Sequence, residues 1–414
     1  MLALQQEKAI AILITASSIV GLQGCGHLGL VSRSSINVAV SLENDQPLTI
    51  NALAKVKDGF KIFQDELNVF YPGLKIRPVF FTQAELIKSI SLRTKAGVGP
   101  DLIVASNEQT NALFKLGLAR EMPPEAFTYK ELAQAKPARI NKTQGSITGV
   151  PLFSSPQLSC YNVKYISRPL STLDALANAS HRGQLAGFEL SFNKLSWSIG
   201  AMGALPSFSK AMQGEVLNAE DYKFIEAWVE WLGTLSNSPG QVFYSDTRSL
   251  ENAFINGQVG WISCLSSEVP YLEEALGSDL AVATLPSGVK APSPLNQISV
   301  VSLGINSNKI QQIDSIRVLR YVLGHPDRIS LRLAQMRVLD TNSTTKADNG
   351  QENTISVMVS AREQAESVSS DKIVLSSGDP RLGNLNRVIG RYIANEVTSQ
   401  SATNQLISIL QAKR

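Results

Sequence analysis

Apolar residues along the chain alternate between the period of strands and the period of helices. A short β-rich run at residues 36–40 precedes a stretch at 48–70 in which apolar residues recur every three or four positions. A second strand is predicted at 74–81, a helix at 83–96 and a third strand at 100–104. This order predicts a largely parallel sheet covered by helices, an α/β fold.

The loops after the first and third strands are the first candidates for a binding site. Ligands bind to parallel sheets at the carboxyl ends of the strands. By that rule, residues 41–45 and 105–109 should lie close together at one edge of the sheet.

The second half of the chain continues the pattern. A strand is predicted at 158–163 and a helix at 218–235, with Asn218 as N-cap and Asp221 three residues later. Trp228 and Trp231 fall on the apolar face of that helix, so we expect them to pack on a sheet rather than stack on a carbohydrate. Further helices are predicted at 310–323, 382–397 and 402–411.

The amino terminus has the features of an export signal. Residues 9–32 contain no Asp, Glu, Lys or Arg, and the apolar run at 9–22 is shorter than the roughly 20 residues that span a bilayer. Its end, Leu22-Gln-Gly-Cys25, resembles a bacterial lipobox. The prediction is a signal peptide at 1–24, lipidation of Cys25 and a linker at 25–35; the alternative is an uncleaved anchor helix. Either places the body of the protein on the extracytoplasmic face of the cell membrane.

Composition excludes several classes of protein. With 414 residues, 43% of them hydrophobic and 18% charged, the chain can bury a large core and form two or three domains. A net charge of +3 provides no basic field for nucleic acid. The three Cys and three His never occur at the spacing of zinc ligands, so neither a metal nor a cofactor is predicted.

The cysteines and histidines in the body of the chain have plain interpretations. Cys160 and Cys264 fall in or beside predicted strands. Export would permit a disulfide, but buried free thiols are the prediction because the sequence supplies no Cα separation. His181 and His325 are expected to be surface or capping residues.

Several segments, in this order, resemble the sugar-binding solute-binding proteins of ABC importers, the family that includes maltose-binding protein. They extend over nearly the whole chain after the amino terminus: Gly99–Ala105, Leu113–Met122, Ile147–Leu152, Tyr161–Asn162, Ala253–Ile262 and Ala281–Gly288. Each motif is short, and their order and spacing carry the resemblance.

The resemblance implies the two-lobed type II periplasmic binding protein fold. Each lobe would hold a mixed, mostly parallel sheet flanked by helices, and the lobes would be joined by hinge crossings near Val150, Asp279 and His325. Residues 36–152 and 280–324 would form the first lobe. Residues 153–279 and 325–414 would form the second.

The implied function is the capture of a small polar solute, sugar or sugar-like, in a cleft between the lobes. A monomer would deliver it to an ABC permease. Small residues such as Ala105, Ser155 and Ser267 replace the larger ligand contacts of relatives, which favours a small solute. The predicted contacts are polar or aromatic residues in loops that would face the cleft: Glu43, Asp45, Ser106, Asn107, Glu108, Phe153, Ser154, Ser155, Asn193, Lys194, Trp197, Ser263, Ser266, Arg381 and Asn384.

Some alternatives remain open at this stage. Trp197 could equally be a core residue, and the serine-rich segments could be plain loops. The protein could also be an anchored scaffold that keeps the fold without a ligand. An exported serine hydrolase is suggested by Ser207-Phe-Ser-Lys210 and Ser245-Asp246, but the third motif of that class, K-T-G, is missing. The polar tract at 341–353 is predicted to be a loop without a role in binding.

Overall fold

The computed structural model describes residues 34–41, 50–123, 141–143, 146–179, 185–324, 339–340, 354–368, 373–375 and 379–412. Some of the predictions above concern residues outside these ranges: the signal peptide at 1–24, Cys25 and all but the end of the linker, Glu43, Asp45, His181, the crossing near His325, and the tract at 341–353.

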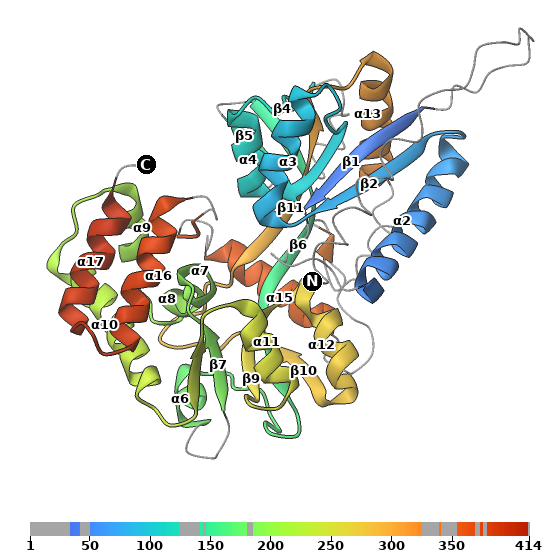
Figure 1. The fold of residues 1–414 in the computed structure, drawn as a ribbon. Coiled ribbons are helices and arrows are strands. Elements are labelled where there is room, and N and C mark those ends of the chain that lie inside the picture. Colours follow the sequence, from blue (N-terminus) through green and yellow to red (C-terminus); the bar gives the residue numbers. More distant parts are fainter. Residues whose placement is uncertain are drawn as a thin grey trace, which may run out of the picture.

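The first sheet begins with three parallel strands. Strand β1 (Ser35–Ser41) lies between β2 (Lys75–Phe81) and β3 (Leu102–Ser106), in parallel register with both. Helices α2 (Ile50–Phe70), α3 (Gln83–Lys95), α4 (Asn107–Lys115) and α13 (Lys309–Gly324) flank this sheet (Figure 1). The observed elements lie within two residues of the predicted strands and helices, because the periodicity that predicts them is local.

A single buried carboxylate ties these strands together. Asp101 is 2% exposed and follows Pro100 at the start of β3. One of its oxygens accepts the backbone N–H of Asn37 in β1 at 2.7 Å, and the other accepts the hydroxyl of Ser307 at 2.7 Å. The Gly-Pro-Asp motif therefore links three separate segments of the first lobe.

The second sheet is also built on three parallel strands. Strand β7 (Ala186–Glu189) pairs in parallel with β8 (Gln241–Tyr244) and with β9 (Trp261–Leu265). The helices of this lobe are α6 (Leu173–Ala179), α7 (Phe192–Leu195), α8 (Trp197–Ala201), α9 (Leu205–Gln213), α10 (Ala219–Ser236), α11 (Thr247–Ile255) and α12 (Val269–Leu276), with short 3-10 turns η4 (Ser266–Glu268) and η5 (Gly277–Asp279).

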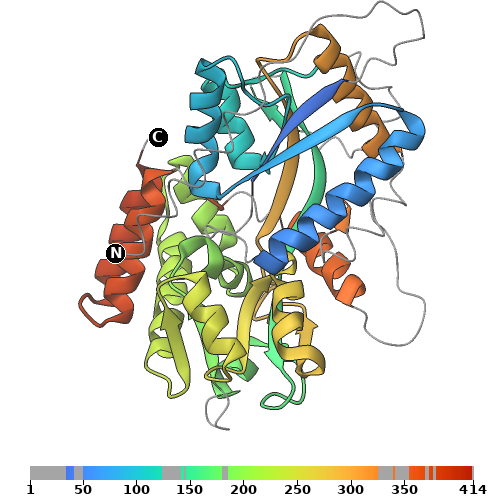
Figure 2. The same ribbon diagram turned by 45° about the vertical axis from the view of Figure 1, so that its right-hand side comes forward.

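The carboxyl-terminal helices belong to this second lobe. Helices α16 (Pro380–Ile393) and α17 (Ser399–Gln411) lie beside α9 and α10 in both views (Figures 1 and 2), and α17 packs on both. The predicted cap of α10 is confirmed, since Asn218 accepts the backbone N–H of Asp221 at 2.9 Å. Trp228 is fully buried on the inner face of this helix, as its position predicted.

Long strands join the two sheets. Strand β6 (Ser146–Asn162) pairs with β11 (Asn296–Gly304) in the first sheet and with β9 in the second. Figure 2 shows β6 and β11 passing side by side between the lobes. Strand β12 (Leu339–Asp340) pairs with β6 at Ser154 and Phe153. Strand β5 (Asn141–Thr143) also pairs with β6, and β4 (Ala119–Arg120) pairs with β11.

Strand pairing places one predicted boundary differently. Strand β10 (Leu280–Ala283) pairs with Ser159–Asn162 of β6, in the second sheet, although a boundary before residue 280 would put it in the first lobe. Helix α15 (Thr354–Ser367) also contacts both β6 and β10. The chain therefore returns to the first sheet between β10 and β11.

The prediction of free thiols at Cys160 and Cys264 is wrong. The two residues form a disulfide with a Cα–Cα separation of 5.9 Å, within the range that a bridge requires. They lie on adjacent antiparallel strands, and Cys160 is opposite Ile262, two residues from Cys264. The bridge depends on this register, which joins strands 104 residues apart in sequence.

Within the described residues, every helix is too short or too polar to cross a bilayer.

Candidate functional site

The carboxyl edge of the first sheet lies at the crossing between the lobes. Parallel strands β1 and β3 end there at Ser41 and Ser106. Ser299, near the start of β11, is opposite Ser106, and β11 pairs with β6 through Pro156 at the same end.

The carboxyl edge of the second sheet lies at the same crossing. Parallel strands β7, β8 and β9 end at Glu189, Tyr244 and Leu265. Gln157 of β6, the residue after Pro156, is opposite Leu265. Both edges that a parallel sheet uses for ligands therefore meet around β6 and β11, and we take this junction as the candidate site.

Serine hydroxyls from two segments meet on the second-lobe side of the junction. Ser155 of β6 donates to the hydroxyl of Ser267 at 2.8 Å, and its oxygen accepts the backbone N–H of Ser267 at 3.0 Å. The hydroxyl of Ser266 lies 3.2 Å from the same oxygen. Ser154 is 1% exposed, and its hydroxyl has no hydrogen-bond partner among the residues that the structure describes. The site thus holds a compact group of hydroxyls around turn η4.

Gln157 connects this group to the returning crossing. Its amide nitrogen donates to the carbonyl of Lys194 at 2.9 Å and to the hydroxyl of Ser263 at 3.2 Å. Its amide oxygen accepts the backbone N–H of Leu295 at 3.2 Å, just before β11. One fully buried side chain therefore links both crossing segments to α7 and β9.

A group of charges lies beneath turn η4. The ammonium of Lys194, whose side chain is 15% exposed, lies 3.0 Å from a carboxylate oxygen of Glu268. The other oxygen of Glu268 accepts the backbone N–H of Leu265 at 2.8 Å. Glu189 accepts the hydroxyl of Thr247. Glu251 on α11 is 8% exposed, and one of its oxygens has no hydrogen-bond partner in the described part of the chain.

Burial and mutual repulsion change the acidity of this group. Desolvation, with a smaller contribution from Glu268, raises the pKa of Glu251 to about 8. Desolvation also raises the pKa of Glu189. Burial by itself lowers the pKa of Lys194, but the carboxylates of Glu268 and Glu189 outweigh it and raise this pKa above its usual range. At neutral pH the site therefore holds a charged Lys194 and a protonated Glu251.

Stability should depend on pH through Glu251. Its pKa is raised from 4.5 to about 8 on folding, so the folded state binds the proton more tightly and the free energy of unfolding falls as pH rises between these values. We expect Glu251→Gln to remove this fall and to stabilise the protein at pH 8.5 by roughly 1 to 3 kcal/mol. Urea unfolding at pH 5, 7 and 8.5 measures this effect. Glu226→Gln on α10 is the matched control, and equal pH dependence in both variants would contradict the assignment.

The first-lobe side of the junction is built at the start of α4. Ser106 caps the helix by accepting the backbone N–H of Gln109 at 3.2 Å. The Gln109 side chain accepts the hydroxyl of Ser41 at 2.9 Å, which ties the ends of β1 and β3 together. Asn107 and Glu108 lie in the first turn of α4 and are half-buried. Their side chains are therefore the partly exposed polar groups at the start of this helix, beside the carboxyl end of β3.

Two of the predicted contact residues serve the core of the second lobe instead. Trp197 is fully buried, with its ring 6.2 Å from those of Trp231 and Trp261. Arg381 is 6% exposed, forms a buried pair with Asp379 at 2.8 Å and donates to the carbonyl of Leu410. Packing engages both side chains in this structure, and a solute contact from either of them stays a prediction.

The remaining second-lobe candidates divide between the junction and its surroundings. Phe153 is half-buried in β6 next to Ser154, and Ser263 contacts Gln157 as described. Asn193 is held on the segment at 373–375, because its side chain bonds the carbonyl and the N–H of Leu375. Asn384 is exposed on α16 and accepts from Arg387.

Sequence reasoning missed four residues of the junction: Gln157, Glu189, Glu251 and Glu268. Only Glu268 could have been found from the sequence, because it lies two residues after Ser266, which was predicted as a contact. The others are brought there by strand register and by the packing of α11 on β7 and β9.

The serine hydrolase motif has a structural role. Ser207 donates to a carboxylate oxygen of Asp221 at 2.9 Å, and Lys210 donates to both of its oxygens at 3.0 Å. Asp221 belongs to the capping box of α10, and Asp246 caps α11. Lys210 is thus an ion-pair partner of Asp221 and does not act as a base on Ser207. Among the described residues, no three His, Cys, Asp or Glu side chains are arranged to hold a metal ion.

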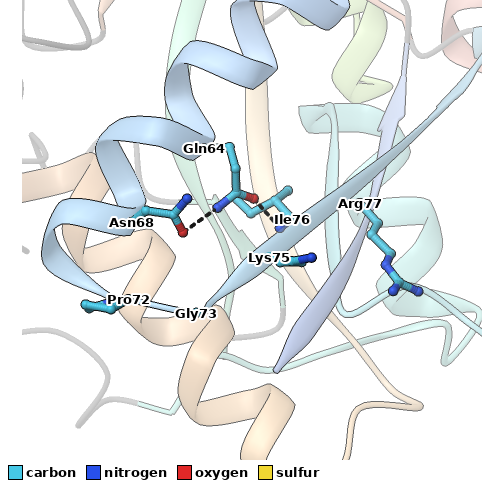
Figure 3. A pocket seen from close by; sticks show the side chains of 7 residues that line it. All are labelled: Gln64, Asn68, Pro72, Gly73, Lys75, Ile76 and Arg77. Carbon is cyan, nitrogen blue, oxygen red and sulfur yellow. Dashed lines mark hydrogen bonds between the residues drawn. The ribbon is translucent and has the colours of Figure 1, made fainter. Parts of the chain in front are cut away.

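The hollow in Figure 3 lies away from the junction. It is open, has a volume of about 570 Å³, and lies between α2 and the edge strand β2, with Lys75 and Arg77 on its rim. The Gln64 side chain donates to the carbonyl of Leu74 and accepts the N–H of Ile76. Figure 3 shows the second of these bonds. The Gln64 amide therefore occupies the carbonyl of Leu74 and the N–H of Ile76, which an added strand would otherwise bond. It thus protects the open edge of β2 from pairing with another strand.

Comparison with known proteins identifies the fold. No protein-family model and no curated protein sequence matches this chain. The GacH receptor of Streptomyces glaucescens, solved unliganded and with acarbose, is 13% identical, with 91% of this chain and 97% of that chain covered and a TM-score of 0.62. The maltose/maltodextrin-binding domain MalE of Bdellovibrio bacteriovorus, bound to maltotriose, is 14% identical, with 91% and 98% covered and a TM-score of 0.62.

A third structure, from work on xylan utilization by Caldanaerobius polysaccharolyticus, is 13% identical, with 91% and 99% of the two chains covered and a TM-score of 0.63. These matches extend over both lobes. The chain therefore has the two-lobed fold of the maltose-type solute-binding proteins, and the fold implied by its sequence motifs is confirmed.

Proposed function

We propose that this protein captures a small polar solute, a sugar or a sugar-like compound, between its lobes and delivers it to the permease of an ABC importer. The observation that carries the proposal is the meeting of two carboxyl strand edges at the crossing strands β6 and β11. Such an arrangement suits capture by closure of two lobes on a ligand. It requires no bond-making chemistry, so the protein acts as a receptor and not as an enzyme.

The strand pairing supports a proposed division into two lobes. We assign residues 36–156 and 296–324 to the first lobe, and residues 157–283 with 354–412 to the second. Compared with the division expected from sequence, this moves the first crossing to Pro156 and the second to the segment between β10 and β11. Gln157, which contacts both crossing segments, lies at the hinge.

We propose that the solute is held by polar groups from both lobes. The first lobe supplies Asn107 and Glu108 from α4, and Glu43 and Asp45 after β1 are further candidates. Strand β6 supplies the hydroxyls of Ser154 and Ser155 at the crossing, and the second lobe supplies those of Ser263 and Ser266. Hydroxyl and amide groups suit the replacement of water around a polyhydroxylated compound. The small side chains at Ala105, Ser155 and Ser267 favour a small sugar over a long glucan.

The amino terminus completes the proposal. We propose that residues 1–24 direct export and that lipid on Cys25 tethers a monomer to the outer face of the cell membrane. The disulfide between Cys160 and Cys264 supports this location, because such bonds persist in oxidising compartments outside the cytoplasm.

A thermal-shift screen of the full-length chain in mild detergent tests the function. Sugars, polyols, polyamines and anions should be compared, and a true ligand at 100 times its Kd should stabilise the folded state by about 2.7 kcal/mol. Stabilisation by a sugar supports the proposal. If no compound shifts the transition, the anchored scaffold becomes the better interpretation.

Glu108→Ala should weaken binding of the solute found in that screen by about tenfold, because a buried hydrogen bond to a charged group contributes roughly 1.5 to 3 kcal/mol. Titration calorimetry measures the affinity. The control is Glu220→Ala on the exposed start of α10, which should bind as the parent does. Equal affinities for all three proteins would remove Glu108 from the site.

A further inference from the structure

Turn η4 carries candidate solute contacts and is held from two directions. On one side, Ser155 of β6 binds the backbone N–H and the hydroxyl of Ser267. On the other side, Glu268 joins the backbone of Leu265 to the ammonium of Lys194, at 2.8 Å and 3.0 Å. The position of the turn therefore depends on the pairing of Lys194 with Glu268.

Glu251 belongs to the same buried group of charges, but among the described residues it is not held by an ion pair such as the one between Glu268 and Lys194. Glu251 is 8% exposed, and within the described ranges its Oε1 atom has no hydrogen-bond partner. The charged groups that act on it are Glu268 from η4, Lys194 from α7 and Glu189 from β7. With all four groups ionised, three carboxylates would share one ammonium.

Among the described residues, the other elements packed on α11 add no cation to this group. Strand β8 contributes Tyr244, and Asp246 at the start of α11 acts on Glu189. Helix α12 buries the apolar side chains of Val269 and Leu272. Lys194 is thus the cation for which Glu251 and Glu268 compete.

We propose that Lys194, Glu251 and Glu268 are positioning residues, which hold turn η4 in its binding arrangement only while Glu251 carries a proton. The inference rests on the proposed function in taking Ser266 as a solute contact. The solute would therefore bind more tightly at mildly acidic than at alkaline pH.

The physical reason is the cost of an unpaired buried carboxylate. When Glu251 releases its proton to solvent, its charge must be compensated inside the protein. The nearby ammonium of Lys194 is drawn towards Glu251, and Glu268 loses its partner. The pKa of Glu251, raised to about 8 by burial, places this change just above neutral pH. Turn η4 then loses one of its two attachments.

Hydrogen exchange of the full-length chain tests the proposal without a ligand. The measured quantity is the protection of backbone amides at 263–268, corrected for intrinsic exchange with a reference peptide from α10. Between pH 6 and pH 9, we expect protection to fall about threefold or more in the wild-type protein. Glu251→Gln, which cannot ionise, should keep its protection, whereas Glu226→Gln should behave as wild type.

Two results would overturn the proposal: unchanged wild-type protection across this range, or an equal loss of protection in Glu251→Gln. A second pair of variants tests the role of Lys194 independently. Lys194→Met should show low protection of residues 263–268 at both pH values, and Lys194→Arg should restore protection at pH 6. Full protection in Lys194→Met would exclude a positioning role for this residue.

Maltotriose is the probe for binding. If it binds, its Kd should rise about tenfold from pH 6 to pH 9 in the wild-type protein and change less than about twofold in Glu251→Gln. A Kd in wild type that does not depend on pH would overturn the link to binding. If maltotriose does not bind at any pH, the sugar found in the thermal-shift screen replaces it in this titration, and the exchange measurement still decides the role of the three residues.

Discussion

Replacing Trp197 by alanine should lower the free energy of unfolding by about 3 to 5 kcal/mol. The side chain is fully buried between the rings of Trp231 and Trp261, so its removal leaves a cavity that the surrounding core cannot fill. Urea unfolding followed by circular dichroism measures the change.

A matched pair of substitutions separates burial from aromatic character. Trp197→Phe keeps most of the ring volume and should cost less than half as much as the alanine variant. Phe224→Ala removes an aromatic ring that is 39% exposed on α10, and we expect less than about 1 kcal/mol from it. If Trp197→Ala left the free energy of unfolding unchanged but weakened solute binding, Trp197 would be a contact residue after all.

Removal of the disulfide should have an effect of similar size. Changing both Cys160 and Cys264 to alanine should lower the free energy of unfolding by about 2 to 5 kcal/mol, because the bridge restricts a long loop of the unfolded chain. The two sulfur atoms are fully buried between β6 and β9, so their loss also removes packing. Chemical unfolding with and without dithiothreitol measures the contribution.

The reducing agent provides the control for this prediction. It should destabilise the wild-type protein and leave the double variant unchanged. Peptide mapping of the unreduced protein should recover residues 160 and 264 in one linked fragment. If dithiothreitol had the same effect on both proteins, the bridge would not contribute to stability.

Local patterns in the sequence were sufficient for most helices and strands. The cap of α10 and the apolar face that buries Trp228 were predicted from spacings of three and four residues, which a helix repeats every turn. Strand β2 and helix α3 were likewise predicted from the residues within each element. Each signal lies within a single element, so no knowledge of distant contacts was needed.

The candidate site was predicted only in part. The ends of β1 and β3 were placed correctly at a shared sheet edge, because parallel strands always end on the same side. Ser155 and Ser266 were named separately, and their contact across 111 residues follows from the pairing of β6 with β9. Trp197 was left open, since the same residue suits a core and a sugar-binding face.

The sequence by itself determined the order of strands and helices and the resemblance that implied two lobes. Tertiary structure alone decided that Cys160 meets Cys264, that Trp197 is buried, and that Lys194 pairs with Glu268. The reason is physical: periodicity reflects neighbours within one element, whereas register and burial depend on segments that are far apart in the chain and meet only when the whole molecule has folded.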